Sequence, residues 1–179
     1  MQGRSISLET RRLRLRCWRE SDREPFAAMN AHPEVMNDLG GPFNRTKSDR
    51  KLDRYVAAFD QYGFSRWVIE SREGNFLGYA GVMPCRGEHP LGSHNEIGWR
   101  LTRQAWGHGY ATEAARAALK DAFTRVGLNE VVAYTAPDNV RSHAVMVRLN
   151  LQRDPSRDFT AYYDEVGNWR GLVWVARPV

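Results

Sequence analysis

The sequence predicts a mixed α/β (α+β) fold, in which one domain over residues 1–179 contains a sheet flanked by helices. Strand-like segments with a two-residue period alternate along the chain with helix-like segments of longer period. The composition, 42% hydrophobic and 26% charged, is that of a globular protein, and 179 residues suffice for one buried core. No internal repeat, low-complexity segment or long linker divides the chain, so we expect a single domain.

The first predicted strand runs from Leu13 to Cys17, where apolar residues alternate with arginines. Ser21 stands three positions before Glu24, the spacing of a capping box, and predicts a short helix that ends toward Pro33. A second helix is expected from Thr46 to Tyr62, with Thr46 and Asp49 as caps and Gly63 at its end. Turn residues then separate three further predicted strands, at 64–70, 76–83 and 95–101, with a loop at 84–94.

The clearest helix follows, from Ala111 to Val126, where apolar residues recur at spacings of three and four. Alanine dominates this apolar stripe, so the helix must pack very close to a sheet, and Gly127 supplies its C-terminal cap. The remaining patterns predict a strand at 130–135, a helix at 140–149 and two aromatic-rich strands at 159–164 and 169–176. A turn at Gly167-Asn168 joins these last two strands.

Charge and cysteine content exclude several classes of protein. No apolar segment approaches the ~20 residues that span a bilayer, and residues 1–8 lack a signal-peptide core, so we expect a cytoplasmic protein without membrane partners. Cys17 and Cys85 lie outside metal-binding spacings, which predicts reduced thiols and no metal site. The net charge of +5 comes mainly from arginines within patterned segments, so it favours a phosphate-rich cofactor over nucleic acid.

One loop is the candidate binding segment. It joins a predicted strand to the alanine-lined helix and has the sequence Gln104-Ala105-Trp106-Gly107-His108-Gly109-Tyr110-Ala111. The first N–H groups of a helix have no internal partner and carry partial positive charge, and glycines let phosphate oxygens approach them. The spacing is neither the GxGxxG of dinucleotide folds nor the GxxxxGK[ST] of nucleoside triphosphate sites. The alternative interpretation is a plain strand-to-helix turn that uses glycine for its geometry.

The residues Gln104-x-x-Gly107-x-Gly109 are similar to the [RQ]xxGx[GA] acyl-CoA signature of the GNAT superfamily of N-acetyltransferases. The string from Trp106 to Ala114 resembles the RimJ/RimL-like branch, whose namesakes acetylate the N-termini of ribosomal proteins. Further resemblances follow in the same order along nearly the whole chain, at residues 9–16, 76–78, 96–99 and 139–142. One departure is Asn150-Leu151, where the family usually has Gly and an aromatic residue. Asn also tolerates the left-handed cap, so the turn should form. The missing aromatic residue weakens any inference from the family about which substrate binds.

This resemblance implies a GNAT-type acyl-CoA N-acyltransferase fold, with a central, mostly antiparallel sheet flanked by helices. It also implies acetyl-CoA as the acyl donor and an amine acceptor, which would be a protein N-terminus, an amino acid or a small-molecule amine. Backbone amides of the glycine loop would bind the pyrophosphate, and the pantetheine arm would add to a splayed strand whose N–H polarises the thioester. The residues assigned to the cofactor are Trp99, Leu101, Gln104, Gly107, His108, Gly109, Tyr110, Ala111, Thr112 and Asn139.

The resemblance also suggests two catalytic residues, each with a structural alternative. Glu96 is the candidate base, directly or through a water, and its alternative is a surface glutamate paired with an arginine. Ser142 is the candidate proton donor to the departing thiolate, and its alternative is an N3 serine that satisfies a helix end. Asn139 is a cofactor contact, a helix N-cap, or both.

Transfer would be direct, without an acyl-enzyme or a metal. A non-catalytic acyl-CoA-binding or sensing module of the same fold is the second functional hypothesis. Because many relatives are dimers, a homodimer is a further expectation.

Overall fold

The computed structural model describes residues 6–179, and these form one nine-stranded sheet with the order β1-β2-β3-β4-β5-β6-β9-β7, to which β8 adds by pairing with β9. Every neighbouring pair is antiparallel except β5 and β6, which are parallel. The mixed, mostly antiparallel sheet is therefore confirmed. The strands are β1 (Ser7–Glu9), β2 (Leu13–Arg16), β3 (Arg66–Ser71), β4 (Phe76–Cys85), β5 (His94–Leu101), β6 (Val131–Thr135), β7 (Gln152–Arg153), β8 (Phe159–Tyr163) and β9 (Gly167–Ala176).

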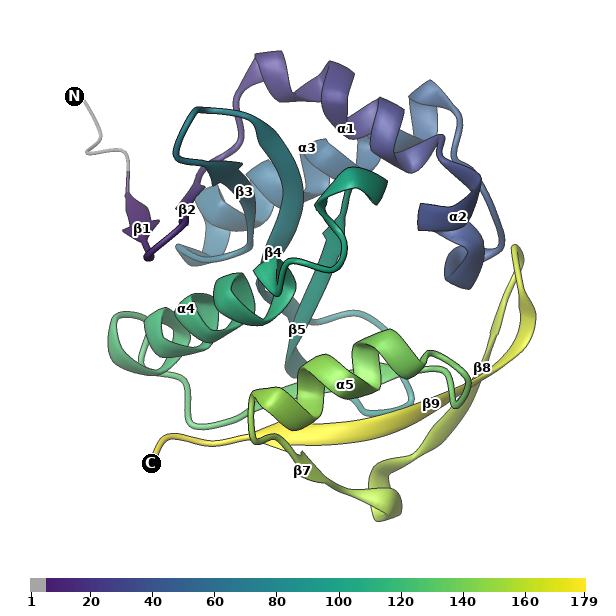
Figure 1. Cartoon of the computed structure of the whole chain (residues 1–179). Coiled ribbons are helices and arrows are strands. Elements are labelled where there is room, and N and C mark those ends of the chain that lie inside the picture. The colour runs from purple at the N-terminus through teal and green to yellow at the C-terminus, as the bar shows by residue number, and fades with distance from the viewer. Residues whose placement is uncertain (1–5) are drawn as a thin grey trace.

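Helices cover both faces of this sheet, and in Figure 1 α4 and α5 lie in front of it while α3 lies behind. The alternation of side chains along β4 shows the two layers: Ala80 belongs to the core under α4, whereas its neighbour Tyr79 packs among residues of α1, α2 and α3. The helices are α1 (Arg23–Asn30), α2 (Pro33–Met36), α3 (Arg45–Tyr62), α4 (Tyr110–Thr124) and α5 (Val140–Arg148).

The alanine-lined helix packs as its sequence predicts. Ala114, Ala115 and Ala118 of α4 are buried in the core that also contains strand residues of β2 to β6. At the other end of α4, Gly127 has a φ of +79°, and the Leu128 N–H donates to the carbonyl of Ala122 at 2.9 Å. Such left-handed closure is the reason that glycine follows the helix.

Two predicted helix caps are wrong. The capping residue of α3 is Asn44, whose side-chain oxygen accepts a hydrogen bond from the N–H of Lys47 at 2.8 Å, so the helix begins one residue before Thr46. Ser21 does not cap α1. Its neighbour Asp22 instead accepts from the N–H of Arg19 at 2.7 Å. The sequence offers several short polar residues at each start, so spacing alone does not select the one that caps the helix.

Several strand boundaries also differ from the prediction. β3 begins at Arg66, and β4 and β5 extend to Cys85 and from His94, which shortens the loop predicted at 84–94. The last hairpin turns at 164–166 rather than at Gly167-Asn168, because Tyr163 already pairs with Gly167. The short elements β1, α2 and β7 have no clear periodicity in the sequence, and the predictions omit them.

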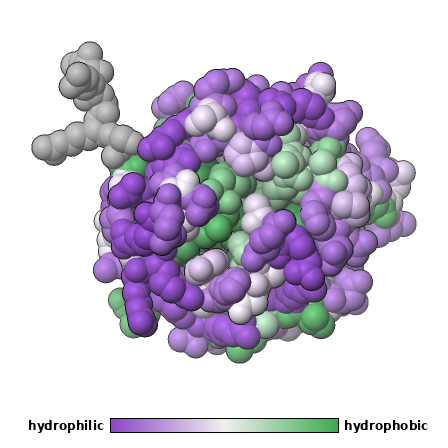
Figure 2. Space-filling model, turned by 45° about the horizontal axis from the view of Figure 1, so that its top comes forward, coloured by the Kyte–Doolittle hydropathy of each residue, from purple (hydrophilic) through white to green (hydrophobic). Residues whose placement is uncertain are grey.

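Hydrophilic side chains cover most of the surface, although apolar residues gather near the middle of the face shown in Figure 2. Within residues 6–179, no helix combines the length and the apolarity needed to cross a bilayer.

Candidate active site

The sheet opens between β5 and β6. These two parallel strands are paired only at Glu96 and Val132, whereas β4 and β5 stay paired over eight residue pairs, up to Gly78 and Leu101. Beyond this pair, from Ile97 to Leu101, the backbone groups of β5 that point away from β4 consequently have no strand beside them. This is the splay that the sequence resemblance implies, and it leaves a strand edge to which an extended ligand can add.

The glycine loop ends at this splay and leads into α4. Gly109 occupies the N-cap position with a φ of +76° and offers no side-chain cap, and Gly107 has a φ of +81° with open space where a side chain would stand. None of the backbone N–H groups of residues 107–112 donates a hydrogen bond within the described chain. Six unpaired donors at a helix N-terminus form a site that is suited to the phosphates of an anionic ligand.

Arg12, in the turn between β1 and β2, fixes this loop from outside. Its Nη1 donates to the carbonyl of His108 at 2.8 Å, and its Nε donates to the carboxylate of Glu113 at 2.7 Å. Burial opposes ionisation of Glu113, but hydrogen bonds from Thr10 and Arg12 outweigh it and lower the pKa of that carboxyl. The one acidic group in the first turn of α4 is therefore neutralised by its neighbours, which leaves the helix end positive.

Trp106 connects the loop to α5. The Cζ atom of Arg141 lies 3.9 Å from the centroid of the Trp106 ring, and that of Arg103 lies 4.7 Å from it. The Nε1 of Trp106 donates to the carbonyl of Leu101 at 3.3 Å. Arg141 thereby brings a cation from the start of α5 to the loop. Arg12 and Arg141 lie in the segments 9–16 and 139–142 that resemble the family, but the sequence predictions assigned a role to neither.

The start of α5 is capped by Asn139, whose Oδ1 accepts from the N–H of Ser142 at 3.2 Å. Asn139 is thus an N-cap and Ser142 an N3 residue, as their structural alternatives state. The Ser142 side chain is half-buried, and its hydroxyl has no hydrogen-bond partner in the described chain.

The other predicted cofactor residues differ in exposure. Gln104 is exposed, and its side chain makes no hydrogen bond among residues 6–179, whereas Leu101 and Thr112 are buried. The His108 ring is exposed and stacks on the ring of Tyr110, with centroids 5.3 Å apart. Trp99 and Ala111 pack against the core beneath α4.

Glu96 lies on the opposite face of β5 from Ile97 and is half-buried. Its Oε2 accepts from Nη2 of Arg66 at 2.9 Å. The arginine that the alternative interpretation required is therefore present, but it is a buried residue of β3 rather than a surface one. Close by, the His94 ring contacts the Tyr134 hydroxyl at 3.3 Å and the Gly92 carbonyl at 2.7 Å.

Positive charge also surrounds Tyr79, which lies on β4, the strand beside Glu96, and on the same face of the sheet. Burial alone would raise the pKa of this phenol, but the charges of Lys51, Arg100 and Arg66 outweigh burial and lower the pKa to about 7. Arg100 itself is held by a bidentate ion pair with Asp38, at 2.8 and 2.9 Å.

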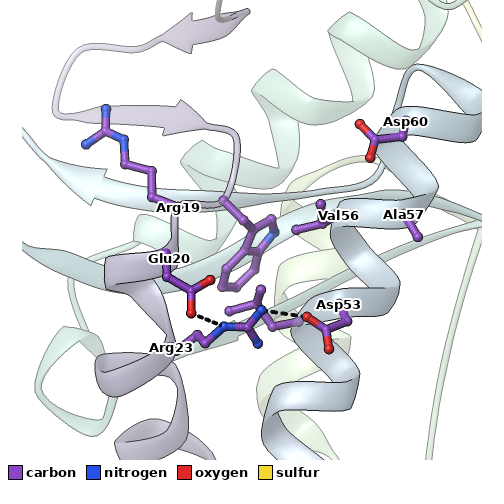
Figure 3. A pocket seen from close by; sticks show the side chains of 9 residues that line it. Arg19, Glu20, Arg23, Asp53, Val56, Ala57 and Asp60 are labelled. Atoms are coloured by element: carbon purple, nitrogen blue, oxygen red, sulfur yellow. Dashed lines mark hydrogen bonds and ion pairs between the residues drawn. The ribbon is translucent and has the colours of Figure 1, made fainter.

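Two surface hollows lie away from these residues. One, of about 300 Å³, lies between α1 and α3, where Arg23 is held between Glu20 and Asp53 (Figure 3). A second, of about 510 Å³, lies between α4 and the end of β9. Neither contains a residue of the glycine loop. Among the residues that the structure describes, no group of three or more His, Cys, Asp or Glu side chains is placed to hold a metal ion.

Comparison with known proteins agrees with this geometry. A family model described as an acetyltransferase (GNAT) domain matches residues 12–152. Protein YkkB of Bacillus subtilis, which is uncharacterized, is 32% identical over 80% of this chain and 84% of its own. The FsC-acetyl coenzyme A-N(2)-transacetylase of Aspergillus fumigatus is 33% identical over 81% of this chain and 64% of its own. An acetyltransferase from Agrobacterium tumefaciens superposes with a TM-score of 0.81 at 26% identity, over 99% of this chain and 98% of its own. The chain therefore belongs to the GNAT acetyltransferase family.

Proposed function

We propose that this protein transfers the acetyl group of acetyl-CoA to a primary amine, directly and with Glu96 as general base. The observation that carries the proposal is the combination of an open β5 edge with six unpaired N–H groups at residues 107–112. A relative named FsC-acetyl coenzyme A-N(2)-transacetylase supports the choice of acyl donor.

Each part of the site has a role in this proposal. The N–H groups of the glycine loop would hold the pyrophosphate, with Arg141 beside them, and the open edge from Trp99 to Leu101 would hold the pantetheine arm. When bound, the thioester supplies an activated acetyl group. Glu96 would take a proton of the acceptor amine at its free Oε1, or through one water, as the C–N bond forms and the C–S bond breaks. The Ser142 hydroxyl would donate a proton to the leaving sulfur and regain one from water.

The acceptor class is part of the proposal. Protein N-termini, which the RimJ/RimL-like string from Trp106 to Ala114 suggests, amino acids and small-molecule amines all carry the required primary amine. The net charge of +5 disfavours long-range attraction of polycations, so we expect spermine to be a poorer acceptor than a peptide N-terminus.

A thiol-release assay tests the proposal. The purified protein receives acetyl-CoA and one of three amines: a tetrapeptide with a free N-terminal serine, L-serinamide or spermine. Free coenzyme A is detected with a disulfide reagent, and the thiols of Cys17 and Cys85 are subtracted with a protein blank. Catalytic thiol release with matching acetylation of the amine supports the proposal. Saturable acetyl-CoA binding without release above the Glu96→Gln variant would instead indicate a non-catalytic acyl-CoA-binding module.

A further inference from the structure

The ion pair at Glu96 extends across three strands. Arg66 lies on β3, and its guanidinium crosses β4 to reach β5. Nη2 donates to Oε2 of Glu96 at 2.9 Å, and Nη1 donates to the Glu96 carbonyl at 2.8 Å and to the Gly81 carbonyl. The Arg66 side chain is 7% exposed, against 26% for Glu96. One residue thus fixes both the backbone and the carboxylate of the candidate base.

Gly98 provides the space for this guanidinium, and Gly81 provides the space for the Arg66 backbone. A Cβ at Gly98 would lie 2.8 Å from Nη2 and 2.9 Å from Cζ of Arg66, and a Cβ at Gly81 would lie 2.7 Å from the Arg66 Cα. Neither glycine has a positive φ. The backbone at these two positions is open to any residue, so it is the guanidinium and its strand that exclude a side chain there.

This arrangement is unfavourable for stability alone. A buried guanidinium loses its hydration, and the Nε of Arg66 has no hydrogen-bond partner in the described chain. An apolar residue at this position would fill the same space without an unpaired donor. The hydrogen bonds that the Arg66 guanidinium donates go to Glu96 and to the Gly81 carbonyl.

We propose that Arg66 is a positioning residue, which fixes Oε2 of Glu96 so that Oε1 faces the acceptor amine. Oε1 accepts no hydrogen bond from residues 6–179, and it is therefore free for this task. In the step that results, an N–H bond of the amine breaks, an O–H bond forms at Oε1, and the proton later passes to water. This inference rests on the proposed function, in which Glu96 is the base.

A double-mutant cycle with Arg66→Met and Glu96→Gln tests the proposal. The kcat is measured with acetyl-CoA and the best of the three amines, and acetyl-CoA affinity is measured separately by calorimetry. We expect Arg66→Met to lower kcat by roughly 10- to 100-fold, with acetyl-CoA affinity changed less than about twofold. In the Glu96→Gln background, Arg66→Met should cause no further loss of kcat, because both substitutions remove the same oriented carboxylate.

Two further variants separate positioning from folding. Arg16→Met is the matched control, because Arg16 is equally buried at 6% exposure and also ion-paired, but with Asp22 and Glu70. It should lower the melting temperature and combine with Glu96→Gln multiplicatively. If Arg66→Met does not fold, Arg66→Lys serves instead, and it should retain an intermediate kcat because one charged donor still reaches Oε2.

The outcomes distinguish the two proposals. Multiplicative losses in the Arg66 and Glu96 cycle would mean that Arg66 acts on structure alone and would overturn the positioning role. Full kcat in Glu96→Gln would overturn it as well. Wild-type protein that binds acetyl-CoA but releases no thiol with any of the three amines would refute the proposed function itself, before any variant is compared.

Discussion

The glycine loop yields a prediction that separates cofactor binding from folding. Gly107, in the loop, and Gly127, beyond the C-terminus of α4, have nearly the same φ, +81° and +79°, and at neither would a Cβ meet an atom within 4 Å. Replacement of either glycine by glutamate therefore introduces the same backbone strain and no clash. Only Gly107 lies beside the unpaired N–H groups, so Gly127→Glu is a matched control for Gly107→Glu.

The expected sizes follow from these positions. A non-glycine residue in the left-handed region costs about 1–2 kcal/mol, which lowers the melting temperature of a chain of this length by about 2–8 °C. The helix dipole should make Gly127→Glu the less stable variant, because its negative charge stands at the C-terminal end of α4. At Gly107, a carboxylate within about 5 Å of a phosphate charge is repelled by about 1–3 kcal/mol, or roughly 5- to 150-fold in Kd.

Thermal unfolding and calorimetric titration with acetyl-CoA measure both quantities. We expect Gly127→Glu to bind acetyl-CoA like the wild type despite its lower stability, and Gly107→Glu to bind much more weakly. Equal binding losses in the two variants would show that the loss follows from stability. Unchanged binding by Gly107→Glu would refute the placement of the pyrophosphate on this loop.

Three further predictions concern single contacts. The lowered pKa of Tyr79 should give a tyrosinate absorbance step at 295 nm near pH 7, and Tyr79→Phe should remove this step. Between this pKa and pH 10, the unfolded state binds more protons than the folded state. The free energy of unfolding of the wild type should therefore rise with pH relative to that of Tyr79→Phe. A step that survives in Tyr79→Phe would contradict the assignment. Gly98→Ala should push the Arg66 guanidinium away from Glu96, with a stability loss of about 1–3 kcal/mol in urea unfolding and a lower kcat; wild-type stability would show that Arg66 adapts. Asn139→Ala should cost about 1 kcal/mol in the same unfolding assay through the lost cap, and a weaker affinity for acetyl-CoA would show a cofactor contact as well.

Most of the architecture was predictable because it is encoded locally. The alanine stripe of α4, the left-handed Gly127 and the glycine loop are all visible as short-range patterns, and the structure confirms each. Asn150 even adopts the positive φ of 58° expected where the family has glycine. The short elements were not predicted, because the four residues of α2 and the two of β7 are too few to establish a period.

The helix caps show the limit of local patterns. Asn44, Thr46 and Asp49 all have cap-forming side chains, and Asp22 competes with Ser21. The structure selects Asn44 at one start and uses Asp22 to bind both the Arg19 N–H and the Arg16 guanidinium at the other. In the second case Asp22 is also held by Arg16 of β2, a contact that a capping spacing does not include.

By itself, the sequence determined the mixed sheet, the alanine-lined helix and the glycine loop, because each depends on residues close together in the chain. Tertiary structure alone decided what surrounds the reactive groups: Arg12 beside Glu113, about a hundred positions away, and Arg66 beside Glu96. The first pair depends on the packing of α4 beside β1 and β2, and the second depends on strand order and register across β3, β4 and β5. A two-residue period fixes which face a side chain occupies but not which residue of another strand it meets, so the partners of the base become visible only in the folded sheet.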